Sequence, residues 1–431
     1  MAAATDIALR QQVMYSVFVR NYSKAGNFEG VRRDLRRIKD LGVDIIWLMP
    51  IHPIGEKCRK GRVGSPYAIK DFRAVNPDFG TEEDLGRLVS DAHGLGMKVI
   101  IDVVYNHTSP DSVLAVSHPE WFYHKPDGSL GNRIGEWYDV VDLDYRKQEL
   151  WDYQIDTLKK WAGIVDGFRC DVASLIPLEF WLRARRKVAE VNPKCLWLAE
   201  SIHRSFLIDC RANGIPASSD AELYQAFDIC YDYDVFDGFT DYLTGQGSLD
   251  DYAKSISAQE GIYPANYVKL RFLENHDQPR AHYMIPDARA LRNWTAFSFF
   301  EKGTALVYAG QEIGESHLPE LFEKDPIDWD HWEVDLTEFI KKLSAIRRQL
   351  DARGVCRVRA EAEKYLIAER KMGGKTVTGV FAVTGLPGVL RTKLTDGIYD
   401  ELISGKKVRV RHQMISCTGE PMILRCAEII S

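Results

Sequence analysis

Cysteine is scarce in this chain, and the cysteines present are widely dispersed. There are 8 cysteines in 431 residues, with no Cys-x-x-Cys pair and no His-rich cluster around any of them. A disulfide framework or a zinc site needs closer or repeated spacing, so we interpret these residues as reduced thiols. Reduced thiols are typical of cytoplasmic proteins, and we predict that location.

The chain also lacks long apolar runs and an excess of positive charge. No stretch approaches the roughly 18 uninterrupted apolar residues of a membrane helix, and the N-terminus has no basic stretch followed by an apolar one. From these absences we predict that the protein has no membrane partner and is not secreted. Because the formal net charge is -6, no basic field is available to hold a phosphate backbone, and nucleic acid is excluded as a partner.

Apolar residues are plentiful, in contrast. Hydrophobic residues make up 45% of the chain and charged residues 27%, enough for one barrel-sized domain and one smaller domain. Internal repeats, low-complexity segments and flexible linkers are not found. Over about the first 350 residues, short apolar strands alternate with amphipathic helical stretches, which predicts parallel βα units.

Eight such alternations favour a closed barrel. The predicted strands are Met14–Val19, Asp44–Met49, Lys98–Val104, Gly163–Arg169, Leu196–Ala199, Ala226–Cys230, Lys269–Leu273 and Thr304–Tyr308. The predicted helices include Phe28–Leu41, Thr81–Leu95, Lys147–Ala162, Leu178–Val191, Ala288–Phe300 and Leu336–Leu350. This number of units suits a (β/α)8 TIM barrel better than an open doubly wound sheet, so we predict an α/β barrel over residues 1–350.

Two further segments depart from the alternating pattern. Residues 105–145, after the third predicted strand, are too long and too rich in turn residues for an ordinary βα loop. We predict a short inserted excursion domain on the C-terminal rim of the barrel. Over residues 351–431 short strands are separated by Gly-rich turns with no helix between them, which predicts a C-terminal antiparallel β-sandwich domain. The strands expected there are Tyr365–Glu369, Thr376–Val383, Gly397–Leu402 and Val408–His412.

Acids and histidines follow four of the predicted barrel strands. The four strand endings are Asp102–His107, Gly167–Asp171, Leu198–Glu200 and Phe272–Asp277. In a TIM barrel the active site lies where the strands end, so these residues should meet on one rim. Any one of them could simply cap a strand, but that reading is disfavoured for all four together.

The strand endings contain the groups that glycosidic bond cleavage requires. Cleavage with retention needs one ionised carboxylate as nucleophile and one protonated carboxyl group as acid. Asp171 and Glu200, from neighbouring strands, suit these roles, since Arg169 lies on the same face as Asp171 and should lower the pKa of Asp171. Desolvation and developing negative charge should favour the protonated form of Glu200 once substrate is bound. Asp277 offers a third carboxylate to the positive charge of the transition state.

These four segments resemble the four short signature motifs of the α-amylase family, in the right order and on the right strands. The resemblance covers the barrel, the excursion domain and, less specifically, the β tail. It implies a retaining glycoside hydrolase with Asp171 as nucleophile, Glu200 as general acid/base and Asp277 as transition-state stabiliser. The supporting hydrogen-bonding residues that it implies are Arg169, His107 and His276.

Other residues fit the same resemblance. The segment Ser65–Phe72 is similar to the family segment whose Tyr stacks on the sugar at the cleavage site, and this makes Tyr67 the candidate platform. Asp102 is similar to the family's buried acid, and we expect it to support Arg169 rather than touch the substrate. Asp142-Leu143-Asp144 is a weak match to a further family motif.

Two departures from the family pattern concern calcium. Family members often carry Lys-His at the positions of Ser174 and Leu175, where a backbone oxygen joins a structural calcium site. Asn106 matches a family calcium ligand, but one amide oxygen is far from the six to eight oxygens that calcium takes. The segment Asn21–Asn27 contains no acid. We therefore predict no required cofactor, and a calcium site is not predicted.

The predicted substrate is an α-glucan oligosaccharide. The leading hypothesis is hydrolysis of α-1,4-glucosidic bonds in maltooligosaccharides, starch fragments or cyclodextrins. A second hypothesis is an α-glucosidase or transglycosylase acting on short α-glucosides, because Asn275–Arg280 also resembles the α-glucosidase form of the fourth motif. A third, a non-catalytic sugar-binding or partner-binding homologue, is disfavoured because all three carboxylates are present.

Overall fold

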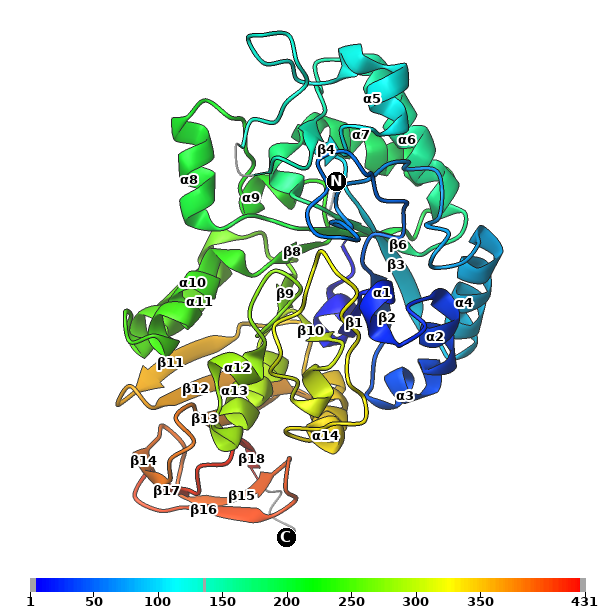
Figure 1. The fold of residues 1–431 in the computed structure, drawn as a ribbon. Helices are drawn as coiled ribbons and strands as arrows, with labels where there is room; N and C mark the ends of the chain where they lie inside the picture. The colour runs from blue at the N-terminus through cyan, green and yellow to red at the C-terminus, as the bar shows by residue number, and fades with distance from the viewer. Residues whose placement is uncertain (1–4, 135–136, 427–431) are drawn as a thin grey trace. The chain divides into compact units, whose positions relative to one another are not determined.

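Eight short strands form a closed parallel barrel, as the sequence predicts (Figure 1). The structure is a computed structural model that describes residues 5–134 and 137–426. Around the barrel the strands follow the order β1-β10-β9-β8-β7-β6-β3-β2. Their bounds are β1 Val13–Val17, β2 Ile45–Leu48, β3 Lys98–Val103, β6 Gly167–Cys170, β7 Leu196–Ala199, β8 Ile229–Tyr231, β9 Lys269–Arg271 and β10 Thr304–Tyr308.

Each predicted barrel strand overlaps an observed one, and the ends differ by a few residues. The strand expected over Gly163–Arg169 begins only at Gly167. The cause is the preceding helix, since the amides of Ile164 and Val165 still donate to the carbonyl of Trp161. All residues of β1, β2, β6, β7 and β10 are buried, as expected for parallel strands that are covered on both faces.

The chain forms two compact units, which are described separately. The first comprises Met1–Thr5, Met14–Tyr231 and Pro319–Asp328, and the second comprises Asp6–Val13, Asp232–Leu318 and Trp329–Ser431. This division runs through the strands of the barrel. The proposed domain boundaries at residues 350 and 351 therefore stay a prediction.

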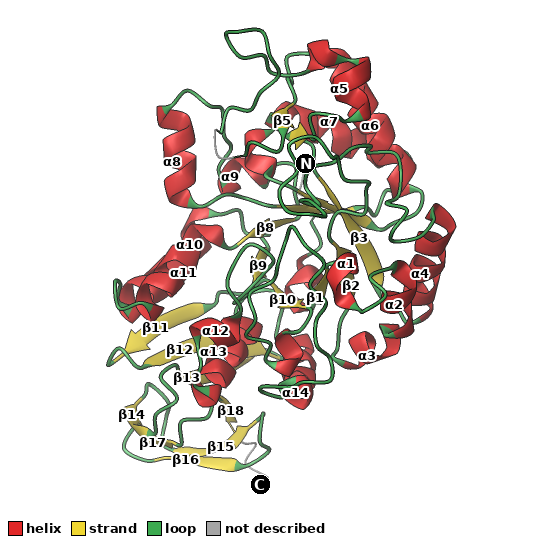
Figure 2. Ribbon diagram, viewed as in Figure 1, coloured by secondary structure: helices red, strands yellow, loops and turns green. Residues whose placement is uncertain are grey.

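The helices of the first unit are drawn in red in Figure 2, and several begin at a residue whose side chain accepts from a backbone amide of the first turn. They are α1 Val19–Tyr22, α2 Phe28–Arg33, α3 Leu35–Asp40, α4 Glu82–Gly94, α5 Val113–Ser117, α6 Gln148–Ala162, α7 Leu178–Val188, α8 Arg204–Ala212 and α9 Asp220–Leu223. Thr81 and Asp84 form a capping box at the start of α4, which satisfies amides that would otherwise lack partners. The single helix predicted over Phe28–Leu41 is wrong, because Asp34 leaves the helical conformation and accepts a hydrogen bond from Tyr22.

The excursion segment, residues 105–145, is held together by a short ladder. Strand β4, His107–Thr108, pairs antiparallel with β5, Val141–Asp142, so that His107 lies opposite Asp142. Between them lie α5 and a 3-10 turn at Pro119–Trp121. Residues 135 and 136 of this segment lie outside the described residues.

The described part of the second unit contains β9, β10 and five α-helices. These helices are α10 Tyr233–Leu243, α11 Leu249–Ile262, α12 Ala281–Met284, α13 Ala288–Phe300 and α14 Thr337–Gln349. The helices α10 and α11 were not among those predicted. Within the described part of the chain, no helix combines the length and the apolar character needed to cross a bilayer.

Two antiparallel sheets complete the second unit. The larger has the order β11-β12-β13-β18-β15-β16 and the smaller pairs β14 with β17. Their bounds are β11 Arg357–Glu361, β12 Tyr365–Met372, β13 Lys375–Ala382, β14 Gly388–Arg391, β15 Gly397–Glu401, β16 Lys407–Val410, β17 Met414–Cys417 and β18 Met422–Cys426. Apolar side chains from both sheets, among them Ile367, Leu390, Ile415 and Leu424, form one core. The C-terminal antiparallel fold is thus confirmed, while four of its strands, β11, β14, β17 and β18, were not predicted.

Candidate active site

One buried arginine connects three carboxylates of the first unit. Arg169, on β6, is fully buried. Its Nη1 lies 2.8 Å from Oδ1 of Asp171 and 3.0 Å from Oδ1 of Asp102. Its Nη2 lies 3.0 Å from Oε1 of Glu200. The sequence predicted the contacts with Asp171 and Asp102, and the contact with Glu200 is an addition.

The register of three neighbouring strands brings these groups together. Asp102 on β3 lies opposite Arg169 on β6, and Cys170 on β6 lies opposite Ala199 on β7. Just beyond the strands, the amide of Asp171 donates to the carbonyl of Val103, and the amide of Glu200 donates to the carbonyl of Cys170. Because the strands are parallel, these continuations of the ladder deliver Asp171 and Glu200 to the same end of the sheet.

The charges at this site stabilise one another. Burial lowers the pKa of Arg169, but the Coulomb attraction of Asp102 and Glu200 outweighs it and raises that pKa well above its ordinary value. A permanently charged guanidinium in turn favours the ionised forms of the carboxylates that it contacts. Oε2 of Glu200 also accepts a hydrogen bond of 2.6 Å from the amide of Val172. The carboxylate of Glu200 is thus held by a charged donor on one oxygen and by a backbone amide on the other.

The residue after the candidate nucleophile has an unusual backbone conformation. Val172 has φ 35° and ψ 44°, in the left-handed region that β-branched residues rarely adopt. This conformation turns its amide toward Glu200 and starts the 3-10 turn Ala173–Leu175. The local strain therefore contributes directly to the link between Asp171 and Glu200.

His107 lies beside the carboxylates as a neutral donor. Its Nε2 is 3.9 Å from Oδ2 of Asp171, and the side-chain amide of Asn106 donates to its Nδ1 at 3.2 Å. Because Nδ1 accepts, the proton of the neutral ring is on Nε2. Burial lowers the pKa of His107 to about 4, although Asp142 and Asp139 act in the opposite direction. His107 can therefore offer an N–H to a sugar hydroxyl at neutral pH.

Three aromatic residues surround the guanidinium of Arg169. Tyr67 is half-buried, its hydroxyl donates to Oδ2 of Asp102 at 3.1 Å, and its ring centre is 5.7 Å from the guanidinium carbon. Nε of Arg169 donates to the hydroxyl of Tyr231 at 3.1 Å, and the ring of Trp47 lies at 5.2 Å. Tyr67 was predicted at the site, whereas Trp47 and Tyr231 were not, since nothing distinguishes an aromatic residue within a buried strand from ordinary core.

The second unit carries Asp277 and His276 on the loop after β9. The side chain of Asp277 is 39% exposed, and its Oδ2 lies 3.0 Å from Nε2 of His276, which is buried. The amide of Asp277 donates to Oδ1 of Asn275, whose Nδ2 donates to the hydroxyl of Tyr233. These contacts fix the backbone beneath Asp277 and leave its carboxylate accessible.

A buried carboxylate closes this loop at its base. Glu274 accepts from Nη1 of Arg280 at 2.8 Å and from the amide of Ala281 at 2.5 Å. Burial raises the pKa of Glu274, while the charge and hydrogen bond of Arg280 lower it. The two ends of the Asp277 loop are thereby joined through one side chain, a feature that the motif in the sequence did not reveal.

Comparison with known proteins agrees with this geometry. Residues 12–127 and 135–351 match the family described as alpha amylase, catalytic domain. The chain belongs to the α-amylase family. Residues 357–424 match the bacterial alpha amylase C-terminal domain.

Solved and curated relatives of this α-amylase family member come from several bacteria. It is 47% identical to an α-amylase from Lactobacillus plantarum, with a TM-score of 0.94 over 97% of this chain and 99% of the other. It is 32% identical to a noncanonic maltogenic α-amylase from Thermotoga neapolitana, with a TM-score of 0.86 over 98% and 100% of the two chains. It is 34% identical to an α-1,4-glucan:maltose-1-phosphate maltosyltransferase from Cereibacter sphaeroides over 75% of this chain and 56% of that protein. The chain spans about half the length of the curated relatives that it matches.

This family member departs from the family pattern just beyond the nucleophile position. Ser174 and Leu175 lie on the 3-10 turn after Asp171, where Ser174 is buried and Leu175 lines a cavity. No cluster of three or more His, Cys, Asp or Glu residues suited to a metal ion occurs among the residues that the structure describes.

Proposed function

We propose that the protein is a retaining α-glucan hydrolase that cleaves α-1,4-glucosidic bonds of maltooligosaccharides, starch fragments or cyclodextrins. One observation carries this proposal: Asp171 and Glu200 contact the same guanidinium, through Nη1 and Nη2 of Arg169. Two carboxyl groups that share one guanidinium suit a double-displacement mechanism, in which no water molecule needs to fit between the second carboxylate and the anomeric carbon.

In the first step, Asp171 attacks the anomeric carbon while Glu200 gives its proton to the departing glycosidic oxygen. The products are a covalent glycosyl-enzyme and a shortened glucan with a new hydroxyl group. In the second step, ionised Glu200 takes a proton from water, the hydroxide oxygen attacks the anomeric carbon, and Asp171 leaves. His107 and His276 donate to sugar hydroxyls, and Asp277 stabilises the positive charge of both transition states. Tyr67 supplies the ring on which the sugar stacks.

We expect the first products to keep the α configuration, because the two displacements each invert the anomeric centre. Proton NMR recorded within the first minutes of hydrolysis of maltoheptaose measures this before mutarotation. The α-anomer signal should rise first and the β-anomer should follow slowly. Initial release of the β-anomer would show that water attacks directly and that Asp171 is not the nucleophile.

We also expect short glucans to be better substrates than granular starch. The positions where family members carry Lys-His hold Ser174 and Leu175, which removes two side chains that could contact remote sugars. Binding energy from distant glucose units should therefore contribute little to kcat beyond a few subsites. The measurement is kcat/KM from maltotriose to maltoheptaose, then cyclodextrins, soluble starch and granular starch. A steep gain beyond seven glucose units, or efficient attack on granules, would contradict it.

Transglycosylation is the second candidate function. The relative from Cereibacter sphaeroides is named as a maltosyltransferase, and the same covalent intermediate can be attacked by a sugar hydroxyl in place of water. Maltoheptaose incubated alone distinguishes the two by chromatography. A hydrolase gives one new reducing end for each bond cleaved, whereas a transferase gives longer glucans at nearly constant reducing power.

A further inference from the structure

Among its described residues, the excursion segment has three buried carboxylates, and each one has its own basic partner. The pairs are Asp139 with Lys60 at 2.9 Å, Asp142 with Arg133 at 3.5 Å and Asp144 with Arg146 at 2.7 Å. The three acidic side chains are 6%, 4% and 5% exposed, respectively. A buried carboxylate is costly unless a cation or hydrogen-bond donors accompany it. Basic side chains therefore provide the countercharge for all three of these carboxylates.

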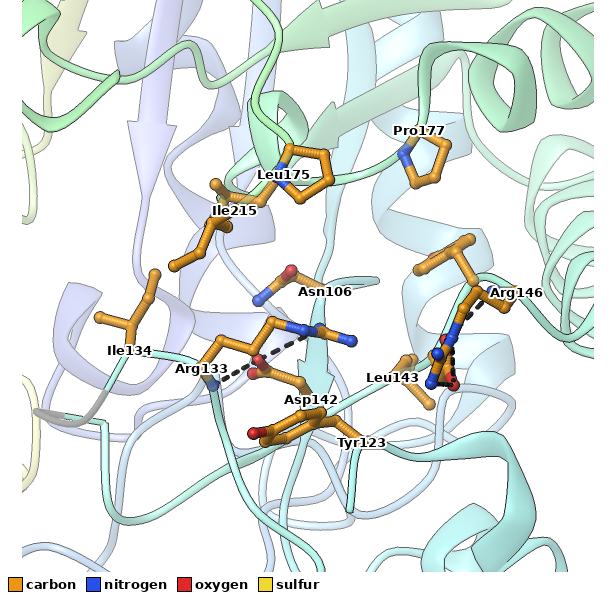
Figure 3. A pocket seen from close by; sticks show the side chains of 13 residues that line it. Asn106, Tyr123, Arg133, Ile134, Asp142, Leu143, Arg146, Leu175, Pro177 and Ile215 are labelled. Carbon is orange, nitrogen blue, oxygen red and sulfur yellow. Dashed lines mark hydrogen bonds and ion pairs between the residues drawn. The ribbon is translucent and has the colours of Figure 1, made fainter. Parts of the chain in front are cut away.

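The Asp142 pair lies beside the amide that resembles a family calcium ligand. Asn106, Arg133 and Asp142 line one cavity of about 380 Å³ (Figure 3). The carbonyl of Asn106 accepts from the amide of Leu143, which places Asn106 next to Asp142. The backbone amide of Arg133 donates to Oδ2 of Asp142 at 2.8 Å, and the guanidinium approaches the same oxygen.

The residues around Asn106 do not fit a calcium ion. Calcium takes six to eight oxygen ligands, and the carboxylates in the lining of this cavity are Asp142 and Asp144. Both oxygens of Asp144 are already bonded to Arg146, at 2.9 to 3.0 Å from Nε and 2.7 Å from Nη2. The guanidinium of Arg133 adds a fixed positive charge to the same lining, and a divalent cation would be repelled by it.

We propose that Arg133 takes the place of a cation in the excursion segment, so that the folded protein neither needs nor admits calcium beside Asn106. The guanidinium neutralises Asp142, whose Oδ1 is buried and accepts no hydrogen bond from the residues that the structure describes. Asp142 pairs with His107 across the β4–β5 ladder. The guanidinium of Arg133 thus stabilises the pairing of β5 with β4, the strand that carries His107, a candidate sugar-binding residue.

Removing the guanidinium of Arg133 should convert the cavity beside Asp142 into a cation site. In Arg133→Met the side chain keeps roughly its length, but Asp142 is left buried without a countercharge in the cavity that Asn106 also lines. A divalent ion with water ligands would then supply the missing charge. The readouts are the melting temperature in calcium, in magnesium and in EDTA, and the luminescence of terbium excited through the aromatic side chains of the cavity, such as Tyr123. Neither readout depends on catalytic activity.

We expect the wild-type melting temperature to be the same in calcium and in EDTA, within about 1 °C. Arg133→Met should melt several degrees lower in EDTA and regain stability in calcium but not in magnesium, and it should bind terbium. The double variant Arg133→Met/Asp142→Asn should lose this calcium response. Lys60→Met is the matched control, because it removes the basic partner of another buried carboxylate, Asp139, and neither residue lines this cavity, so this variant should stay insensitive to calcium.

Two results would overturn the proposal. One is a wild-type protein that is stabilised by calcium or binds terbium in a way that Asp142→Asn abolishes. The other is the absence of any calcium response in both Arg133→Met and Arg133→Gln, the second of which retains a hydrogen-bond donor. A variant that is recovered folded only when calcium is present supports the proposal.

Discussion

Asp171→Asn and Glu200→Gln should each lower kcat on maltoheptaose by at least about a thousandfold, a barrier increase of about 4 kcal/mol. Asn cannot form the glycosyl ester, and Gln can neither donate a proton to the leaving oxygen nor remove one from water. Both variants should fold, because each amide keeps the shape of the acid and Arg169 retains two of its three carboxylate partners. The measurement is steady-state kinetics together with the melting temperature.

A glucosyl fluoride substrate and azide separate the two roles. Fluoride leaves without protonation, so Glu200→Gln should still form the glycosyl-enzyme, and azide should release it as the α-glycosyl azide. Asp171→Ala opens space for azide on the opposite face and should give the β-glycosyl azide. Asp166→Asn is the control for loss of a carboxylate. Asp166 lies just before β6, where its Oδ2 accepts from the backbone amide of Val99 and bonds to Nε2 of His93. If Asp171→Asn or Glu200→Gln kept more than about a tenth of the wild-type kcat, the assigned role would be wrong.

The part of this site that could be predicted lies at strand ends. Asp102, Arg169, Asp171 and Glu200 follow or occupy short apolar strands, and parallel strands bring their carboxyl ends to one edge whatever the details of the helices. The sequence therefore predicted which side chains come together on β3, β6 and β7. It did not predict that Arg169 also contacts Glu200, because this depends on the turn at Val172, whose left-handed conformation is unusual for valine.

Local sequence signals were weaker outside the barrel strands. Helix α10 contains Gly238 and several aromatic and β-branched residues, all of which favour helix poorly. Its neighbour α11 does begin with an N-terminal capping residue, since the hydroxyl of Ser248 accepts from the amide of Asp251.

Contacts that depend on how the chain packs account for most of what remained hidden. The Glu274 carboxylate closes the Asp277 loop through Ala281, and Tyr231 reaches Arg169 across the first unit. Neither contact follows from spacing in the sequence, because both depend on where the elements pack. Motifs thus identify the groups that react, while the groups that orient them become visible only in the folded chain.

Arg169→Lys should lower kcat by at least about a hundredfold and should also destabilise the fold. The guanidinium contacts Asp102 and Asp171 through Nη1, Glu200 through Nη2, and Tyr231 through Nε. A lysine ammonium is a single point charge that cannot span this arrangement, so Asp171 and Glu200 would lose their fixed separation. Breaking a buried ion pair typically costs about 3–5 kcal/mol, and Arg169→Met should approach that cost or fail to fold.

Arg271→Lys separates the catalytic effect from the structural one. Arg271 is equally buried in the second unit, where its Nη1 lies 2.7 Å from Asp232 and 3.4 Å from Glu301. Its contacts include neither Asp171 nor Glu200, so we expect a lower melting temperature with kcat within about threefold of wild type.

The pH dependence of kcat adds a second readout. Arg169→Lys should move the acidic limb to higher pH, because Asp171 must be ionised to attack and a poorer countercharge raises its pKa, whereas Arg271→Lys should leave that limb unchanged. If both variants lost stability to a similar extent and kept kcat within tenfold of wild type, Arg169 would be a structural residue and would not position the reacting carboxylates.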